Sequence, residues 1–405
     1  MMTNKSIKHW FVLISCCGLA GASIGVSINT SGVFYEPVAN ALGILRGDFA
    51  MHMTIFSIVT AVISLFIPKI IEKVNYKLLL LIGIIGGTAG TAAMALGKNV
   101  MMFYILGAIR GACTGLFSAV TLTMVVNNWF SEKHGLATSI VFGTSGLVGT
   151  VLSPVLTSCI ANFGWQMSYV IKAVILCVLC LPALLYPYHL HPADDGLLPY
   201  GYIKQQKVVK DNISTHQFHY LTSAFIAFFI YAIISAFITG VTQHLPGFAK
   251  SIGMSATTGA LLLSSGMAGN IISKIVIGSL TDKIGALKSA LTMMMINAIA
   301  VILLITTSSS MIMIVGAFLF GSCYSIGAVG LPLLTKYFFG IENYNQAFPK
   351  ISFASNIGAA MALSLIGYVY DFFGSYYYAF FAILIIIALG FILLLISNKT
   401  KNQAK

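Results

Sequence analysis

Charged side chains are scarce in this sequence. Asp, Glu, Lys and Arg together make up 8% of its 405 residues, whereas a soluble domain usually carries about 25%. Hydrophobic residues make up 58% of the chain, and the mean hydropathy is +0.93. A soluble core cannot bury this much apolar surface, so we expect lipid to be the solvent for most of the chain.

Motifs of soluble catalysis are missing as well. The sequence contains no GxSxG, no HExxH and no phosphate-binding loop ending in GK[ST]. We therefore expect that the chain is not an enzyme, and an ATP-driven pump is disfavoured. If the chain moves a solute, the driving force must come from a gradient or from exchange.

The seven cysteines all lie inside apolar runs. Cys177 and Cys180 have the C-x-x-C spacing of metal and redox sites, but they lie on an apolar segment with no third ligand nearby. Cysteines buried on helices usually serve packing. We predict no metal, no cofactor and no redox centre.

Long apolar runs fill most of the chain. A transmembrane helix needs roughly 20 apolar residues, and continuous hydrophobicity favours helices over barrel strands, which alternate over about 10 residues. The sequence therefore predicts an all-α membrane protein with twelve spans. Their expected ranges are 10–37, 49–70, 78–98, 101–128, 135–161, 165–187, 218–245, 255–280, 287–307, 311–338, 346–370 and 375–397.

The longest polar stretch, 188–217, separates six predicted spans from six more. We interpret it as a cytoplasmic linker. It divides the chain into an N-terminal six-helix bundle, 1–187, and a C-terminal six-helix bundle, 218–405. A layout of six and six with a central loop is typical of transporters built from two repeats.

Lysines set the expected orientation. With the N-terminus in the cytoplasm, nearly all loop lysines fall on the cytoplasmic side, and only Arg46, Lys98 and Lys250 fall on the other. This asymmetry follows the positive-inside rule. It predicts a multi-pass protein of the cell (cytoplasmic) membrane with both termini inside. The formal net charge of +12 is then explained without nucleic acid, because no dense basic cluster offers a grip on phosphates.

Three groups of residues carry a family likeness. Gly278–Gly285 follows the eighth span, and Pro68–Asn75 puts an acid and a lysine at the equivalent place after the second. Arg110–Gly115 lies in the fourth span. The fifth span holds Gly143, Gly146, Gly149 and Pro154. Together these segments resemble the loop, fourth-helix arginine and fifth-helix glycine-proline motifs of the major facilitator superfamily, which implies twelve transmembrane helices in two six-helix halves.

A closer likeness is to the oxalate/formate antiporter and monocarboxylate transporter branch of that superfamily. It is carried by segments 128–137, 192–201, 269–278 and 337–340. The resemblance implies transport of small organic anions. Lys274 stands where that branch has a basic residue in the eighth helix. Asn270 stands where the proton-coupled members have an aspartate, and Ser355 where the oxalate transporter has a second basic residue. Neither a two-cation dicarboxylate clamp nor the branch's proton carboxylate is therefore intact.

Four basic residues lie inside predicted spans, and ionisable groups there are functional candidates because they are costly to bury. We expect Lys350, near the cytoplasmic start of its helix, to snorkel to water. Lys172 either snorkels outward or lines the cavity. Arg110 and Lys274 are predicted substrate contacts. The alternatives are a structural hydrogen bond to backbone carbonyls for Arg110 and an interhelical strut for Lys274.

The ten acidic residues all fall at predicted span ends or in loops. No carboxylate is therefore expected in mid-membrane to neutralise Arg110 or Lys274. An unpaired buried cation costs roughly several kcal/mol, and a bound carboxylate substrate would supply the missing charge. This is the main physical reason to expect anions as the substrate class.

Polar and aromatic groups complete the predicted pocket. The resemblance places the first, fourth, seventh and tenth helices around the cavity, with the eighth and eleventh nearby. The predicted further substrate contacts are Asn29, Tyr231, Tyr324 and Ser355, although Tyr in a span is also a common interface anchor or packed residue. Asn270, Asp282 and Lys172 are predicted to act in coupling or gating. His52, near the outer end of its span, is a further proton-site candidate or a polar anchor.

We predict a secondary active transporter that moves a small organic anion, monocarboxylate-like, by alternating access. The alternative within the same class is an efflux carrier for larger amphipathic compounds, with a wide, uncharged pocket. A transport-dead sensor that binds an anion and signals to a partner is disfavoured, because the tails and the linker offer no signalling domain. The expected partners are the small organic anion and the lipid bilayer, and we expect a monomer.

Overall fold

The structure is a computed structural model that describes residues 2–131, 134–186, 188–201, 220–340 and 343–401. These residues are almost entirely helical, and they hold no strand apart from an isolated bridge between Phe130 and Tyr200. The chain forms two compact units, 1–44 with 51–207 and 45–50 with 208–405. The predicted linker 188–217 lies partly outside the described residues, so the predicted domain bounds stay a prediction.

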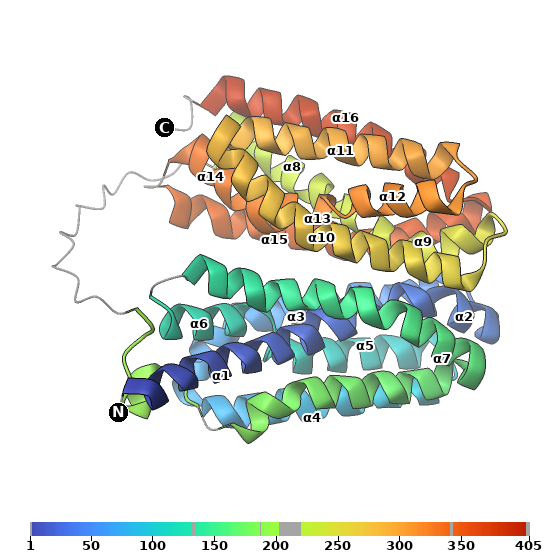
Figure 1. The fold of residues 1–405 in the computed structure, drawn as a ribbon. Helices are drawn as coiled ribbons and strands as arrows, with labels where there is room; N and C mark the ends of the chain where they lie inside the picture. The colour runs from blue at the N-terminus through green and yellow to red at the C-terminus, as the bar shows by residue number, and fades with distance from the viewer. Residues whose placement is uncertain (1, 132–133, 187, 202–219, 341–342, 402–405) are drawn as a thin grey trace. The chain divides into compact units, whose positions relative to one another are not determined.

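The first unit begins with a helix whose hydrogen bonding changes from the α to the π pattern at Gly21. Its elements are α1 (Met2–Ala20), the π-helix η1 (Gly21–Asn29), α2 (Gly32–Leu42), most of α3 (Arg46–Lys73), α4 (Tyr76–Ala93), η2 (Met94–Leu96), α5 (Val100–Gly115), α6 (Ala119–Trp129), α7 (His134–Leu185) and the short η3 (Pro192–Asp195). Helices α4 and α5 lie side by side, and α1 packs along α7 (Figure 1).

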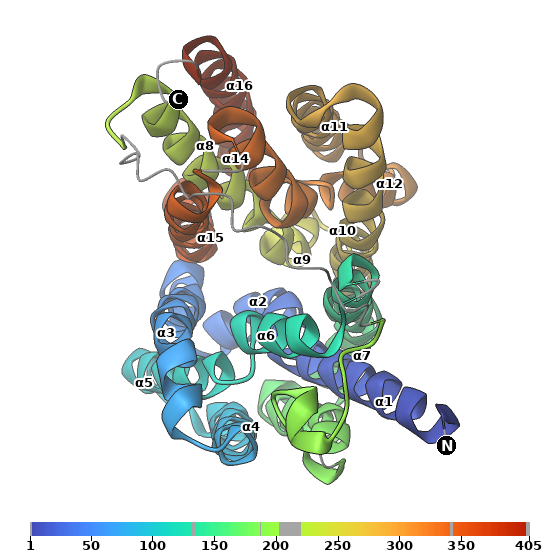
Figure 2. The same cartoon turned by 90° about the vertical axis from the view of Figure 1, so that its left-hand side faces the viewer.

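The second unit has the same kind of architecture. Its elements are α8 (Ser223–Thr239), α9 (Val241–Ser251), α10 (Ala256–Ile284), α11 (Ala286–Thr306), α12 (Ser310–Phe320), α13 (Cys323–Ser325), the π-helix η4 (Ile326–Gly330), α14 (Leu331–Phe339), α15 (Tyr344–Phe373) and α16 (Tyr377–Thr400). Seen along the helices in Figure 2, α8 lies beside α15 and α16, and α12 lies beside α10 and α11.

The predicted number of spans is confirmed. Eleven stretches of the described residues are long and apolar enough to cross a membrane. The longest of them, Leu136–Leu185, has non-helical backbone angles at Gly164 (φ 77°, ψ 166°), where two helices meet in a sharp turn. A φ of this sign suits glycine, which lacks a Cβ atom. Counting this stretch as two helices gives 11 + 1 = 12 spans.

Four of the twelve spans are interrupted, and they recur with a regular period. The α-helical hydrogen-bond pattern is interrupted at Thr30 and Ser31 in the first span, between α5 and α6 in the fourth, at Gly240 in the seventh, and between α12 and α14 in the tenth. The backbone leaves helical angles most clearly at Ser118 (φ −94°, ψ −155°), whereas Gly240 keeps them (φ −61°, ψ −30°). In contrast, α3, α10, α11, α15 and α16 each run without a break. Broken helices at membrane depth are tolerated where they line a cavity or are buried in protein, and in transporters they mark binding regions.

Close helix packing holds each unit together. In the first unit, a Cβ atom on Gly18 of α1 would collide with the carbonyl oxygen of Leu179 in α7. In the second unit, Gly269 of α10 leaves the same kind of space for the carbonyl of Phe318 in α12. Without a hydrophobic driving force between helices in lipid, such close backbone contact is what favours their association.

The second unit includes the first turn of α3, residues 45–50. Asp371, near the end of α15, accepts hydrogen bonds from the main-chain N–H of Arg46 (3.1 Å) and of Gly47 (2.7 Å). The Arg46 guanidinium lies 4.0 Å from the centre of the Tyr370 ring. A carboxylate is favoured at a helix N-terminus, where N–H groups lack helical partners. Asp371 therefore caps α3.

Candidate functional site

Arg110 is buried in the middle of the first unit. It lies on α5, about 10 residues from the start of a span that extends from Val100 to Trp129, so it is roughly 15 Å from that end. Its side chain is 1% exposed, and its Nε donates a hydrogen bond to Oγ1 of Thr91 on α4 at 3.1 Å. Its Nη1 and Nη2 atoms have no hydrogen-bond partner among the described residues. A buried charged group without partners is strongly unfavourable.

A glycine makes room for this arginine. A Cβ atom on Gly90 of α4 would lie 2.8 Å from Cγ of Arg110. Gly86 and Gly87 lie one helical turn from Gly90, and Gly83 lies two turns away; all three approach α5 in the same way. These glycines allow close packing of α4 against α5, and Gly90 also limits the position of the Arg110 side chain.

Lys172 is the second buried cation of the first unit. It lies in the second half of α7 and is 1% exposed. Its Nζ atom lies 5.0 Å from the centre of the Phe34 ring and 5.8 Å from that of Tyr169. Of the two interpretations of Lys172, snorkelling to the surface is wrong.

The residues that the structure describes offer these cations no acidic partner. Among the described residues, no carboxylate forms an ion pair with Arg110, Lys172 or Lys274. Glu36 differs from the expectation that every acid lies at a span end. Because α2 continues to Leu42, Glu36 lies inside that helix and is buried, and it accepts a hydrogen bond from Asn40 at 3.2 Å.

Lys274 and Asn270 lie in the second unit. Both are on α10, one helical turn apart, with Lys274 partly buried and Asn270 buried. The Oδ1 atom of Asn270 has no hydrogen-bond partner in the described part of the chain. Ser355 is partly buried on α15. The structure therefore places Arg110 with Lys172 in one unit, and Lys274, Asn270 and Ser355 in the other.

Of the remaining predicted contacts, Asn29 and Tyr324 bond to the protein itself, whereas the hydroxyl of Tyr231 has no hydrogen-bond partner among the described residues. Asn29 is buried and donates a hydrogen bond through Nδ2 to the carbonyl of Ser145 at 3.0 Å. Tyr231 is fully buried on α8, where its ring stacks on Phe228. Tyr324 is partly buried, and its hydroxyl donates to the carbonyl of Thr239 at 3.4 Å, next to the break in the seventh span.

Three further predicted residues lie where their surroundings limit their roles. Asp282 is exposed in the last turn of α10, next to the loop that follows this helix. Lys350 is exposed, with its Nζ atom 4.1 Å from the centre of the Tyr220 ring, which agrees with snorkelling. His52 is buried on α3 beside Phe103, with a ring separation of 6.4 Å.

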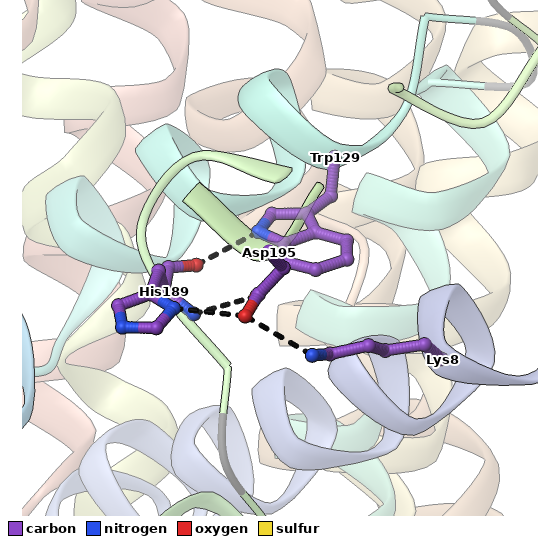
Figure 3. Close-up of polar contacts among 4 residues, drawn as sticks. All are labelled: Lys8, Trp129, His189 and Asp195. Carbon is purple, nitrogen blue, oxygen red and sulfur yellow. Dashed lines mark hydrogen bonds and ion pairs between the residues drawn. The ribbon is translucent and has the colours of Figure 1, made fainter. Parts of the chain in front are cut away.

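One polar cluster ties the start of the linker to the first unit (Figure 3). Oδ1 of Asp195 lies 3.1 Å from Nζ of Lys8 and 2.8 Å from Nδ1 of His189, and Oδ2 accepts from the main-chain N–H of His189 at 3.1 Å. Trp129 donates through Nε1 to the carbonyl of His189 at 3.0 Å. Partial burial of the Asp195 carboxylate would by itself raise its pKa. The hydrogen bonds from His189 and Lys8 outweigh that effect, so the pKa of Asp195 is lowered.

Several of these residues were not found from the sequence. Thr91 and Gly90 were not singled out as partners of Arg110, and His244 was not singled out at all. His244 is buried on α9, just after the break at Gly240, with Nε2 2.8 Å from the carbonyl oxygen of Leu363. Its visible signal in the sequence is an ionisable side chain inside a predicted span, next to Thr242 and Gln243.

Comparison with known families decides the class of protein. The model of the Major Facilitator Superfamily matches residues 16–249 and 223–405. The chain belongs to the Major Facilitator Superfamily. It is therefore a multi-pass membrane transporter and not an enzyme, and the resemblance inferred from the motifs is confirmed.

Curated relatives of this Major Facilitator Superfamily protein are distant. The MFS-type transporter YcxA of Bacillus subtilis (strain 168) is 24% identical over 274 residues, 65% of each chain. The oxalate:formate antiporter of Oxalobacter formigenes is 23% identical over 309 residues, 75% of this chain and 70% of that protein. A putative glycerol-3-phosphate transporter of Arabidopsis thaliana is 26% identical over 115 residues, 27% of this chain and 22% of that protein. The match thus spans just under two thirds of YcxA and less of the plant protein.

Solved structures show the same fold. A bacterial homologue of the human lysosomal transporter Spinster, inward-facing and occupied, has a TM-score of 0.69 and 12% identity, covering 97% of both chains. The peptide transporter POT in complex with alafosfalin has a TM-score of 0.71 and 14% identity, covering 98% of this chain and 96% of that one. At this level of identity the likeness concerns the fold of this superfamily member alone.

Proposed function

We propose that this Major Facilitator Superfamily transporter carries small organic anions, monocarboxylate-like in size, by alternating access. The observation that carries the proposal is the charge imbalance inside the spans. Arg110 and Lys172 are each 1% exposed, and no described carboxylate pairs with either of them or with Lys274. A protein that keeps uncompensated cations at this depth gains most from a ligand of opposite charge.

The relatives support an anionic substrate class. The printed names of two of them describe carriers of oxalate and formate and of glycerol 3-phosphate, which are all anions. The segments that resemble the oxalate/formate and monocarboxylate branch also favour an anionic substrate. The substitution of Asn270 and Ser355 for charged residues of that branch supports one carboxylate in preference to two.

The interrupted spans support alternating access. They are the first, fourth, seventh and tenth, so each unit contributes two. Transporters of this general design place their substrates at such helices and expose the site to one side and then to the other. In this proposal Asp282, at the end of α10, belongs to a helix-end loop on the cytoplasmic side, and both termini lie in the cytoplasm.

Counterflow into proteoliposomes tests the proposal. Vesicles loaded with one unlabelled acid are diluted into the same labelled acid, in a series of formate, lactate, pyruvate, oxalate and succinate. We expect saturable uptake of at least one small monocarboxylate, absent from protein-free vesicles and strongly reduced by Lys274→Gln. Lys274→Arg, which keeps the charge, is the matched control.

Two results would count against it. If no acid is taken up, the proposed transport of small organic anions is wrong. Efflux of larger amphipathic compounds is then the favoured function. If an acid is taken up equally well by wild type and Lys274→Gln, the carrier stands but the role of Lys274 is wrong.

A further inference from the structure

The residues that follow α7 form a structured strap on the first unit. We define the strap as residues 188–200, which include η3. Its main chain turns back on itself, with a hydrogen bond from the N–H of Gly196 to the carbonyl of Ala193 at 2.9 Å. Tyr188 and Leu190 are buried in the same apolar core as residues of α1 and α6. A segment with its own turn and its own buried side chains is part of the folded unit, in contrast to a loose connection.

The strap binds the end of α6. The N–H of Tyr200 donates to the carbonyl of Trp129 at 2.8 Å, and the carbonyl of Tyr200 accepts from the N–H of Ser131 at 3.0 Å. Asn128 donates through Nδ2 to the carbonyl of Leu190 at 3.2 Å, and Nε1 of Trp129 donates to a second strap carbonyl at 3.0 Å (Figure 3). All four hydrogen bonds use main-chain atoms of the strap.

The strap also binds α1 and α4. Nε2 of His9, near the start of α1, lies 2.9 Å from the carbonyl oxygen of Leu198. The ion pair drawn in Figure 3 adds a second contact with α1. The hydroxyl groups of Tyr76, at the start of α4, and of Tyr188 lie 3.1 Å apart. The strap therefore connects the first, third and fourth spans at the end of the unit where α1 begins.

These contacts matter because α6 is a short helix that follows an interruption. It has 11 residues, and Ser118 before it has an extended backbone (φ −94°, ψ −155°), so the regular helix stops between α5 and α6. Residues at the ends of helices are the ones that absorb changes of φ and ψ when a segment swings. A swing of α6 about Ser118 would move the end near Trp129 furthest, and that end is the one the strap binds.

We propose that the strap holds α6 on α1 and α4 throughout the transport cycle. This end of the first unit then moves as one body and does not open by a bend at Ser118. The proposal gives a role to residues 192–201, which carry part of the family likeness and which anion transport does not explain. It goes beyond the proposed function, since it requires only that the chain transports a solute, whichever solute that is.

A disulfide across the contact tests the proposal. Phe130 and Tyr200 lie opposite each other in the isolated bridge, with 5.9 Å between their ring centres. The Cα atoms of such a pair lie about 5 Å apart, which a disulfide can span. The full-length protein with Phe130→Cys and Tyr200→Cys is oxidised in proteoliposomes, and the bond is verified by mass spectrometry. Wild type and the two single variants, which cannot form this bond, receive the same oxidant as controls.

We expect the oxidised double variant to retain counterflow of a labelled acid within about twofold of wild type, because transport does not break this contact. A loss of tenfold or more on oxidation, reversed by a reductant and absent from the single variants, would overturn the proposal. In that case α6 must leave the strap during transport.

Hydrogen exchange measured by mass spectrometry tests the strap without any flux. Asp195→Ala removes the acceptor of two strap contacts. We expect it to speed exchange in residues 126–131 about tenfold and to leave residues 100–115 of α5 unchanged. Asp194→Ala, at the exposed neighbouring position, is the matched control. Unchanged exchange in 126–131 would show that the strap does not hold α6. If no acid is taken up by wild type, only the proposed anion transport fails, and hydrogen exchange alone decides on the strap.

Discussion

Asp195, at the start of the linker, forms an ion pair with Lys8 near the beginning of α1, with 3.1 Å between Oδ1 and Nζ. The same carboxylate holds the side chain and the backbone of His189, whose carbonyl is bound by Trp129 at the end of α6. One side chain therefore fixes the linker to two helices of the first unit.

Replacing Asp195 should lower the stability of the first unit. Asp195→Asn removes the charge that both Lys8 and His189 bind, and its side chain is 8% exposed. Charge-assisted hydrogen bonds at partly exposed positions contribute about 1–2 kcal/mol in sum. Thermal unfolding of the purified protein at pH 7 should show a lower midpoint for Asp195→Asn and no change for Asp194→Asn, because Asp194 is exposed beside it.

The same contact predicts a pH dependence. The pKa of Asp195 is lowered in the folded protein, so its contribution to stability is fully present above the unfolded value of about 4. It is lost as the pH falls through the lowered folded value. The difference in midpoint between wild type and Asp195→Asn should therefore be constant from pH 7 to about pH 5 and shrink below pH 4. A difference that grew on acidification would contradict the assignment.

Gly90→Ala should disturb Arg110 specifically. The added Cβ atom would lie 2.8 Å from Cγ of Arg110, so the guanidinium must move away from Thr91. We expect carboxylate counterflow to fall at least tenfold while the protein stays folded. Gly143→Ala is the matched control, because a Cβ atom there meets nothing within 4 Å. Equal flux in both variants would mean that the position of Arg110 does not matter for transport.

Asn270→Asp should weaken anion binding through Lys274. Positions 270 and 274 are one turn apart on α10, so a carboxylate at 270 pairs with the lysine and reduces its attraction for a substrate. We expect the KM of counterflow to rise several-fold at pH 7, and to recover at low pH as the aspartate is protonated. Asn270→Ser, which is neutral, should keep KM close to that of wild type. A KM that is unaffected by the new charge would place Lys274 outside the anion's path.

Asp371→Ala should destabilise the start of α3. The variant leaves the N–H groups of Arg46 and Gly47 without their acceptor, and loss of such a cap costs about 1 kcal/mol. Hydrogen exchange measured by mass spectrometry should show faster exchange in the peptide that covers residues 45–50. Asp282→Ala, at an exposed helix end, is the control and should leave that peptide unchanged.

The spans could be predicted from the sequence because lipid imposes a length and a hydrophobicity on each helix. The interruptions within the first, fourth, seventh and tenth spans could not be predicted. Thr30 and Gly240 lie inside the expected spans 10–37 and 218–245, whose hydrophobicity averaged over a window of residues does not register a local interruption. Glu36 was expected at a span end, but α2 continues to Leu42 and buries it. The end of a helix is set by local packing, which composition does not encode.

The candidate site was only partly predictable for a similar reason. The depth of Arg110 and Lys172 in apolar runs marked both as costly. Their lack of an acidic partner depends on what the neighbouring helices place around them, and the room for Arg110 depends on Gly90 of α4. These are relations between distant parts of the chain that no motif records. The likeness to the monocarboxylate branch drew attention to Lys274, whereas the unpartnered guanidinium atoms lie in the other unit.

The most direct test of the account is competition between acids and their neutral isosteres. Counterflow of the best labelled monocarboxylate is measured with unlabelled formate, acetate or lactate and, in parallel, with formamide, acetamide or lactamide. In the proposed carrier, negative charge is what the buried cations recognise. The acids should therefore compete with the labelled substrate, and the amides should have no effect at tenfold higher concentration. Equal competition by acids and amides would contradict the central claim.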